Sequence, residues 1–255
     1  MTGRFDGKVA LVTGGSSGIG ECVARALAAE GAEVAILASS SLDKAHAVAS
    51  SIVAAGGNAR PYKADVRDAA AMIALMASVE ADLGGLDLLV NAAGVFYATP
   101  VGATDGGDAA RMIDINVTGL WNSIAAATPL MQRRGGGRIV NCASTAAMIG
   151  INSHALYCAS KAAVVMMTRA LTAELAPMNI AINAVAPGNT ATPMNEDVRN
   201  NAEAIAAMQA MTPSGVAFSD ADAIAGVILF LLSNEARAVH GATWLADEGI
   251  SAAIG

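Results

Sequence analysis

The chain is poor in the residues that mark several classes of protein. Of its 255 residues only 15% are charged and 4% are aromatic, and the net charge is −7. A nucleic-acid-binding module needs a basic stripe or face, and this composition does not supply one. Arg133, Arg134 and Arg138 cluster around three glycines, a pattern typical of a surface turn before a strand. We therefore expect no nucleic-acid partner.

Cysteine and long apolar runs are also scarce. Cys22, Cys142 and Cys158 have no metal-ligand spacing and are too few for a disulfide framework, so small buried thiols in a reducing compartment are expected, with no metal site. The longest apolar stretch, Ala223 to Leu232, is far shorter than the roughly 18 residues that a spanning helix needs. The first residues lack the apolar core of a signal peptide. The chain is expected to be cytoplasmic, with no membrane partner.

Apolar residues are abundant, at 54%, and they fall into strand-like runs separated by helical patterns. Such alternation predicts a doubly wound parallel sheet of about seven strands, covered by helices on both faces. No linker or repeat divides the chain, so residues 1–255 are expected to form one domain. The expected strands are 9–12, 33–37, 59–64, 86–90, 138–142, 180–185 and 242–246. The expected helices are 18–30, 42–55, 68–83, 108–133, 154–176 and 220–232.

A glycine-rich turn follows the first expected strand and opens the first helix. It comprises Gly14, Ser16, Ser17, Gly18, Ile19 and Gly20. Glycines let the backbone approach a phosphate closely, and the helix start offers free N–H groups to a pyrophosphate. Tight turns from strand to helix also use glycine, but this position in an α/β unit favours nucleotide binding.

Tyr157 precedes Lys161 by four residues, which places both side chains on one face of a helix. An ammonium near a phenol favours the phenolate, so such a tyrosine can exchange a proton with an alcohol or carbonyl. Taken alone, the spacing more often marks a tyrosine packed under an exposed lysine. The other motifs decide between the two interpretations.

Taken together, the motifs resemble the classical short-chain dehydrogenase/reductase family, and in particular its branch of 3-oxoacyl-carrier-protein reductases. The glycine turn resembles the family's Thr-Gly-x-x-x-Gly-x-Gly, and the resemblance runs from Lys8 to the C-terminus. The other matching segments are 91–94, 116–119, Ser144, Tyr157 with Lys161, and 187–192. The resemblance implies a Rossmann-like fold, a homotetramer, and an NAD(P)-dependent oxidoreductase acting on ketones or secondary alcohols.

The resemblance also implies a catalytic tetrad of Asn116, Ser144, Tyr157 and Lys161. Tyr157 would exchange a proton with the substrate oxygen, and Ser144 would donate a hydrogen bond to that oxygen. Lys161 would favour the phenolate and bind the nicotinamide ribose, while Asn116 would hold a water that links Lys161 to solvent. Alone, Ser144 could equally be a cap and Asn116 a helical amide bonded to the backbone. We assign His154 to the helix start rather than to catalysis.

The remaining cofactor contacts follow the family's pattern of segments after successive strands. Asp65 and Val66 would contact adenine, although Asp65 could instead cap the helix that follows. The other positions implied are Ser39, Asn91, Ala92, Gly94, Tyr157, Lys161, Pro187, Gly188, Thr190 and Thr192.

The choice of cofactor and substrate is less constrained. No carboxylate stands at 37–41 to repel a 2′-phosphate, so NADP(H) is favoured over NAD(H), although the basic residues usual in NADP users are also missing. Phe96, Thr145 to Asn152, His154 and a substrate loop at 191–215 are expected to select a ketone or alcohol of moderate apolar size. Arg199 is the one candidate partner for an anion, and a solvated surface role is the favoured interpretation of this residue. The alternative function is a non-catalytic dinucleotide sensor on the same fold.

Overall fold

The strands form one continuous parallel sheet in the computed structural model, which describes residues 3–103 and 106–252. Their spatial order is β3-β2-β1-β4-β5-β6-β7, and every neighbouring pair is parallel. The predicted doubly wound parallel sheet is thereby confirmed. The strands are β1 (Val9–Thr13), β2 (Glu33–Ala38), β3 (Asn58–Lys63), β4 (Leu88–Asn91), β5 (Gly137–Cys142), β6 (Ile180–Pro187) and β7 (Thr243–Ala246).

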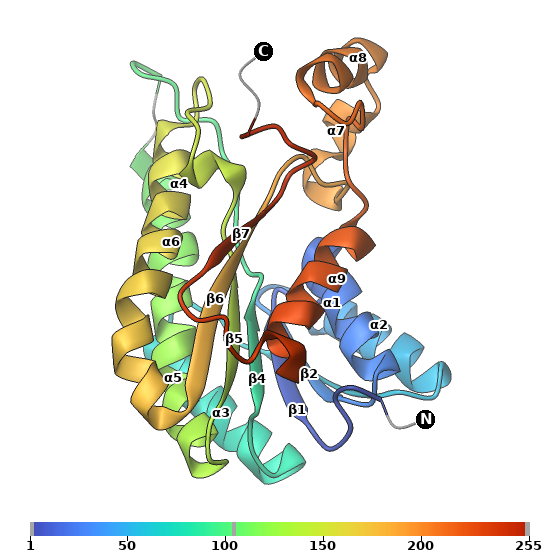
Figure 1. Cartoon of the computed structure of the whole chain (residues 1–255), viewed down its shortest axis with the longest axis vertical. Helices are drawn as coiled ribbons and strands as arrows, with labels where there is room; N and C mark the ends of the chain where they lie inside the picture. Colours follow the sequence, from blue (N-terminus) through green and yellow to red (C-terminus); the bar gives the residue numbers. More distant parts are fainter. Residues whose placement is uncertain (1–2, 104–105, 253–255) are drawn as a thin grey trace.

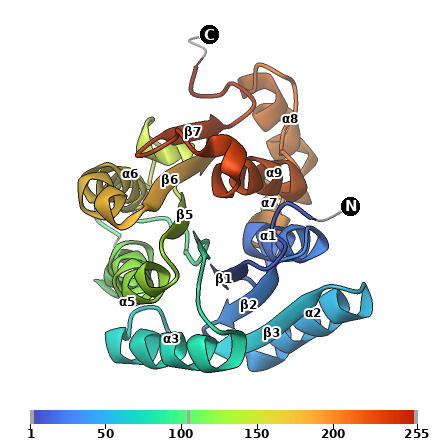
Figure 2. The same ribbon diagram turned by 60° about the horizontal axis from the view of Figure 1, so that its bottom comes forward.

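Two layers of helices cover the sheet, as Figures 1 and 2 show. One layer packs α1 (Gly18–Ala29), α2 (Leu42–Ala54) and α9 (Ala221–Leu232) against one face. The other packs α3 (Ala69–Leu83), α5 (Leu120–Arg133) and α6 (Ala155–Leu175) against the opposite face. Because both faces are covered, β1 and β6 are buried along their whole length. This explains why the strands are continuous apolar runs rather than alternating ones.

The strand order reverses between β1 and β4. The chain builds outward from β1 to β3 and then returns to β4 on the other side of β1. Ligands of open α/β sheets bind at such a reversal, beyond the carboxyl ends of the strands. The loops after β1, β4, β5 and β6 therefore surround the expected site.

Two segments differ from the prediction. The single helix expected over 108–133 is α4 (Gly106–Ile113), a π-helical turn (Asp114–Gly119) and α5 in succession. Wider turns of this kind are frequent at functional sites, and this one carries Asn116. The stretch 191–215, expected to be a loop, contains α7 (Glu196–Arg199) and α8 (Ala202–Met211), which lie above α9 in Figure 1.

Among residues 3–103 and 106–252, no helix has both the length and the apolar composition that crossing a bilayer requires.

Candidate active site

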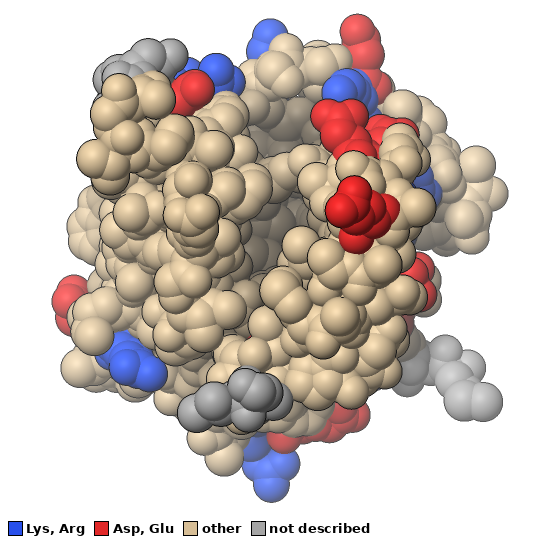
Figure 3. All heavy atoms as spheres, turned by 90° about the horizontal axis from the view of Figure 1, so that it is seen from above, with Lys and Arg blue, Asp and Glu red and all other residues tan. Residues whose placement is uncertain are grey.

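The carboxyl end of the sheet is hollowed. Figure 3 views this end of the molecule, and the hollow lies between the α4–α6 side and the side formed by α7, α8 and α9. Side chains inside it are almost all uncharged, whereas Lys, Arg, Asp and Glu lie around the rim. The segments predicted to carry the chemistry meet at this end.

The glycine turn after β1 packs directly on two of those segments. Gly14 and Gly18 have φ values of +67° and +55°, which side chains other than glycine rarely adopt. A Cβ on Gly14 would lie 2.8 Å from the amide nitrogen of Ala93, in the turn after β4. A Cβ on Gly18 would lie 3.3 Å from Cγ2 of Thr192, beyond β6. The turns after β1, β4 and β6 are thus in mutual contact.

The start of α1 fits a phosphate. Ser17 is the extended N-cap residue, yet its hydroxyl accepts no capping hydrogen bond, and Ser17 is exposed. The first N–H groups of α1 therefore keep no side-chain partner and face the glycine cradle with the positive end of the helix dipole. Ser16 and Ile19 are half-buried beside them, and Gly20 is buried against the carbonyl of Gly14. These residues fit the pyrophosphate of a dinucleotide.

Lys161 and Tyr157 lie together on the first half of α6. Lys161 is only 7% exposed, and its Nζ donates to the carbonyl of Cys142 at the end of β5, over 2.9 Å. The same Nζ lies 5.8 Å from the centre of the Tyr157 ring. A buried ammonium with one protein acceptor retains two further donors. Lys161 is therefore buried and held by the end of β5, which excludes the interpretation of a tyrosine packed under an exposed lysine.

Ser144 follows β5 and begins a short 3₁₀ turn (Thr145–Ala147). Its Oγ accepts from the amide of Ala146 over 3.2 Å, so the capping role considered from the sequence is present. The hydroxyl hydrogen remains available to donate. The same turn is tied to α6, because Sγ of Cys158 donates to the carbonyl of Ile149 over 3.7 Å.

Asn116 joins three segments at the back of the site. Its Oδ1 accepts from the amide of Val95 over 2.9 Å, and its Nδ2 donates to the carbonyl of Val95 and to Oγ of Ser160. A Cβ on Gly94 would lie 3.3 Å from Asn116 Oδ1 and 3.6 Å from Lys161 Nζ. Gly94 thus leaves room between Asn116 and Lys161. The alternative interpretation of Asn116 was an amide bonded to the backbone. Such bonds are present, and the backbone that they reach is that of Val95, in the loop after β4.

Ser160 is a residue of the site that the sequence reasoning missed. It is fully buried, and its Oγ donates to the carbonyl of Tyr157 over 2.8 Å while accepting from Asn116. It precedes Lys161 directly, and its bond to Asn116 links α6 to the π-helical turn. A polar residue on the buried face of α6 was the available signal.

Asn91, predicted to line the cofactor, has its side chain turned into the sheet. Its Nδ2 donates to Oδ1 of Asn141 on β5, and Nδ2 of Asn141 donates to Oγ1 of Thr168 on α6, both over 2.9 Å. No hydrogen-bond donor among the described residues reaches Oδ1 of Asn91. These buried amides hold β4, β5 and α6 in register beneath the site, and sequence reasoning did not foresee the network.

The residues expected at the adenine end have partners of their own. Asp65 forms a two-pronged ion pair with Arg67, and this pairing lowers the pKa of the carboxyl group below its ordinary value. The helix that follows is capped by Asp68, whose carboxylate accepts from Ala71, so Asp65 is not its cap. Val66 is buried beneath α5, while Ser39 is exposed directly after β2.

The segment after β6 is folded by short hydrogen bonds. The amide of Gly188 donates to the carbonyl of Ala246, while Oγ1 of Thr190 donates to the carbonyl of Gly188. Arg199 donates to Oδ1 of Asn195 and to the carbonyl of Thr192. Arg199 therefore holds this segment together. The last residue of β6, Pro187, is buried, and Thr192 is half-buried.

An aromatic wall stands beside Tyr157. Phe96 and His154 stack with ring centres 4.4 Å apart and planes 8° from parallel. Phe96 meets Tyr157 edge-on at 4.7 Å. His154 precedes the first turn of α6 without capping it, since its Nδ1 lies 2.7 Å from the carbonyl of Asn152. The wall fixes one side of the Tyr157 ring.

The three cysteines are free and half-buried. Burial raises the pKa of the Cys142 thiol to about 11, and burial together with a hydrogen bond that the thiol donates to Asp222 does the same for Cys22. Both thiols are protonated at neutral pH, so neither is a nucleophile there.

Comparison with known proteins agrees with this geometry. Residues 8–203 match the family model for short chain dehydrogenases. The chain is 37% identical to 2,3-dihydro-2,3-dihydroxybenzoate dehydrogenase of Bacillus subtilis (strain 168), with 91% of each covered. It is also 37% identical to 3-oxoacyl-[acyl-carrier-protein] reductase of Synechocystis sp., covering 95% of this chain and 96% of that protein.

A solved relative is the gluconate 5-dehydrogenase of Burkholderia cenocepacia J2315, in complex with NADP and tartrate. It superposes with a TM-score of 0.94 at 32% identity and 99% coverage of each chain. The match of the family model to most of the chain, together with these relatives, places the protein among the short-chain dehydrogenases, enzymes that oxidise alcohols or reduce ketones.

Proposed function

We propose that this enzyme transfers a hydride between a nicotinamide dinucleotide and a ketone or secondary alcohol of moderate apolar size, using Asn116, Ser144, Tyr157 and Lys161. The observation that carries the proposal is the buried Lys161 ammonium, which lies beside the Tyr157 ring and next to Gly94, in the turn after β4 that packs on the glycine cradle. A dinucleotide bound in the cradle supplies the hydride or accepts it.

The residues of the chain handle the proton and the charge. In reduction, Tyr157 gives its phenolic proton to the carbonyl oxygen as that oxygen becomes an alkoxide. The hydroxyl hydrogen of Ser144 donates to the same oxygen and stabilises the developing charge. Lys161 stabilises the tyrosinate that is left, because its ammonium is buried and close to the ring. Asn116 and Ser160 hold the backbone around both groups in place.

We infer that the cofactor is NADP(H). The supporting observation is the end of β2, where Ser39 and Ser40 are exposed and no carboxylate stands to repel a 2′-phosphate. Lys63 is in register with Ala38, the residue before Ser39, and is exposed at the end of β3. A Ser39→Asp variant is expected to shift the ratio of kcat/KM toward NADH.

Exposed apolar side chains support the choice of an apolar substrate. Large apolar side chains are exposed on the segments that flank Tyr157, and exposed apolar side chains that gather around a cleft are typical of a ligand-binding groove. They are Phe96, Met148, Ile151, Met194, Met211 and Val216. The segment 191–215 supplies two of them, Met194 and Met211, and we assign it to substrate binding. Relatives of equal identity are named for unrelated substrates. The proposed class of substrate therefore rests on these exposed apolar side chains and not on family membership.

We further propose that the enzyme is a homotetramer. Trp121 on α5 and Met166 on α6 are 49% and 59% exposed. A groove of about 200 Å³ beside Trp121 is lined by residues of α5 and α6, including Pro129 and Leu171. At the open edge of the sheet, β7 exposes Trp244 and Leu245. Second copies of the chain on these two faces would give a tetramer, and a monomeric mass by light scattering would contradict it.

A cofactor-resolved screen tests the proposed function. Purified enzyme is assayed with NADPH and with NADH against cyclic, aryl and 3-oxoacyl ketones, following absorbance of the reduced nicotinamide. We expect turnover with at least one apolar ketone and a preference for NADPH. Cofactor binding by fluorescence without turnover across the panel would instead support a dinucleotide sensor.

A further inference from the structure

A second pocket lies at the opposite end of the sheet from the active site. It has a volume of about 310 Å³ and is formed by the starts of β1, β4, β5 and β6 with the ends of α5 and α9. β5 connects the two sites: Arg138 near its start lines the pocket, and Cys142 at its end holds Lys161. Arg138 and Cys142 are four residues apart along the strand, a distance of about 13 Å. The pocket is therefore not part of the catalytic cleft.

The pocket concentrates positive charge in an acidic protein. Arg4, Lys8, Arg134, Arg138 and Arg237 line it and make up five of the chain's 15 Lys and Arg, while the net charge of the chain is −7. Only one carboxylate, Asp87, lines the pocket among the described residues. Such a concentration of one sign in a concave surface attracts anions.

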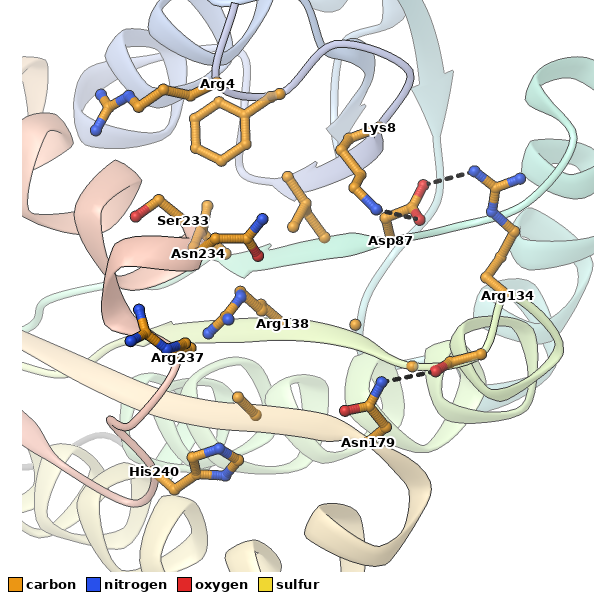
Figure 4. A pocket seen from close by; sticks show the side chains of 17 residues that line it. Arg4, Lys8, Asp87, Arg134, Arg138, Asn179, Ser233, Asn234, Arg237 and His240 are labelled. Atoms are coloured by element: carbon orange, nitrogen blue, oxygen red, sulfur yellow. Dashed lines mark hydrogen bonds and ion pairs between the residues drawn. The ribbon is translucent and has the colours of Figure 1, made fainter.

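Three of these cations have carboxylate partners. Asp87 is buried, and its two oxygens accept from Lys8, Arg134 and the amide of Val9. Arg4 is paired with Glu30 and, at 3.6 Å, with Glu235. Figure 4 shows Lys8 and Arg134 turned toward Asp87 on one side of the pocket. The charge on this side is balanced, and its hydrogen-bonding groups are used.

The other side of the pocket is not balanced. Arg138 is half-buried, and among the described residues the only hydrogen bond of its guanidinium is a long one, 3.4 Å, to the carbonyl of Ala236. Burial lowers the pKa of its guanidinium. Within the described parts of the chain, neither Arg138 nor Arg237 forms an ion pair. The side chains of Asn234 and His240 line the same side in Figure 4.

Helix polarity accounts for only part of this cluster. α5 and α9 end at the pocket, and the carbonyl ends of helices attract cations. Arg134 directly follows α5, so the carbonyl end of this helix and the carboxylate of Asp87 together account for its position. Arg138 lies on a strand, and keeping an uncompensated guanidinium half-buried is unfavourable. A bound anion would compensate it.

We propose that this pocket binds a phosphate group, either as inorganic phosphate or on a small phosphorylated metabolite, through Arg138 and Arg237 with His240 and Asn234. Two guanidinium groups present planar forks of donors that match oxyanions. Donors here come from β5 and from the turn after α9, so they approach from more than one direction. A tetrahedral phosphate accepts such an arrangement better than a planar carboxylate.

The test measures phosphate binding to enzyme saturated with NADPH, so that the cofactor cradle is already occupied. Inorganic phosphate is titrated by calorimetry and by thermal unfolding, with sodium chloride at matched ionic strength as the reference and citrate as the carboxylate arm. We expect one phosphate per subunit and a saturable rise in Tm of about 3–5 °C at ten times Kd. Arg138→Gln and Arg237→Gln should each weaken binding about tenfold or more.

Arg133→Gln is the matched control. Arg133 adjoins Arg134 at the end of α5, but it is paired with Glu80 and lies outside the pocket, so phosphate affinity should not change. Because Arg237 is exposed, Arg237→Gln should fold, and its phosphate affinity can be measured even if Arg138→Gln does not fold. The proposal is overturned if phosphate acts no differently from chloride, if citrate binds and phosphate does not, or if Arg133→Gln weakens binding as much as Arg237→Gln.

Discussion

The two ends of the sheet use opposite chemistry. At the carboxyl end, α1 begins in a glycine cradle with uncapped N–H groups, and Lys161 is a buried cation fixed by the carbonyl of Cys142. At the amino end, α5 and α9 finish, and arginines and a lysine surround one carboxylate, Asp87. Helices antiparallel to the strands put their positive ends on one side and their negative ends on the other.

The difference lies in how each end deals with charge. The carboxyl end offers backbone N–H groups to an anion, and it holds the proposed catalytic side chains with neutral amides and hydroxyls, such as Asn116 and Ser160. The amino end relies on side-chain charge. Changes at the catalytic end should therefore alter turnover with small effects on salt sensitivity, while changes at the amino end should do the reverse.

The largest effect is expected from Lys161→Ala at the catalytic end. Removing the buried ammonium leaves the tyrosinate unstabilised and the carbonyl of Cys142 without its donor. We expect kcat to fall by about 10²–10⁴ and the affinity for NADPH to weaken. Steady-state kinetics and cofactor fluorescence measure the two effects. Turnover within tenfold of wild type would show that the ammonium is not needed.

Ser160→Ala should have a smaller effect. It leaves Nδ2 of Asn116 without one acceptor in a buried position, at a cost of about 1–3 kcal/mol. We expect kcat to fall by about tenfold, with little change in KM for NADPH, because Ser160 positions Tyr157 and does not touch the cofactor cradle. The control is Ser78→Ala on α3, where the exposed hydroxyl only returns to its own helix. A drop in stability with unchanged kcat would contradict a positioning role.

The aromatic wall should contribute less again. His154→Ala removes the stack on Phe96, and aromatic pairs of this kind contribute about 0.5–1.5 kcal/mol. We expect kcat/KM for apolar ketones to fall a few-fold, up to about tenfold. His154→Phe retains a stacking ring and should restore most of the loss. Equal losses in both variants would mean that the imidazole itself is required.

The smallest effect is expected at the proposed adenine end, where Asp65 and Arg67 form an ion pair. Arg67 holds the pKa of Asp65 below its ordinary value, so the stability from this pair is present above the ordinary pKa and is lost as pH falls through the lowered one. In Arg67→Gln the carboxyl titration followed by NMR should move up toward the ordinary value. An unchanged midpoint would show that Arg67 is not the cause.

The fold was largely predictable because buried parallel strands are continuous apolar runs. Every expected strand overlaps an observed one, and the ends of helices such as 18–30 differ from the prediction by about one residue. The helices after Thr192 were missed because a stretch with several Asn and Pro residues and scattered methionines has no clear helical period. The π-helical turn within 108–133 was missed because its sequence, like that of an α-helix, carries no break.

The members of the proposed site can be named from the sequence, whereas the hydrogen bonds that connect them cannot. Asn116, Ser144, Tyr157 and Lys161 lie on motifs with fixed spacing. Their links run between residues far apart in sequence, such as Nδ2 of Asn116 to Ser160 and Asn91 to Asn141. The Arg133–Arg138 cluster was predicted to be a surface turn, but the pocket also needs Arg4 and Arg237 from the two ends of the chain. Pairings of this kind become visible only in the folded sheet.

The most direct test of the proposed chemistry is Tyr157→Phe, assayed for cofactor binding and for turnover in one preparation. The change removes one hydroxyl and keeps the ring that packs edge-on against Phe96. We predict that NADPH binds within a few-fold of the wild-type affinity while ketone reduction falls by about 10²–10⁴. Full turnover by Tyr157→Phe would contradict the account, because the proton would then come from another group.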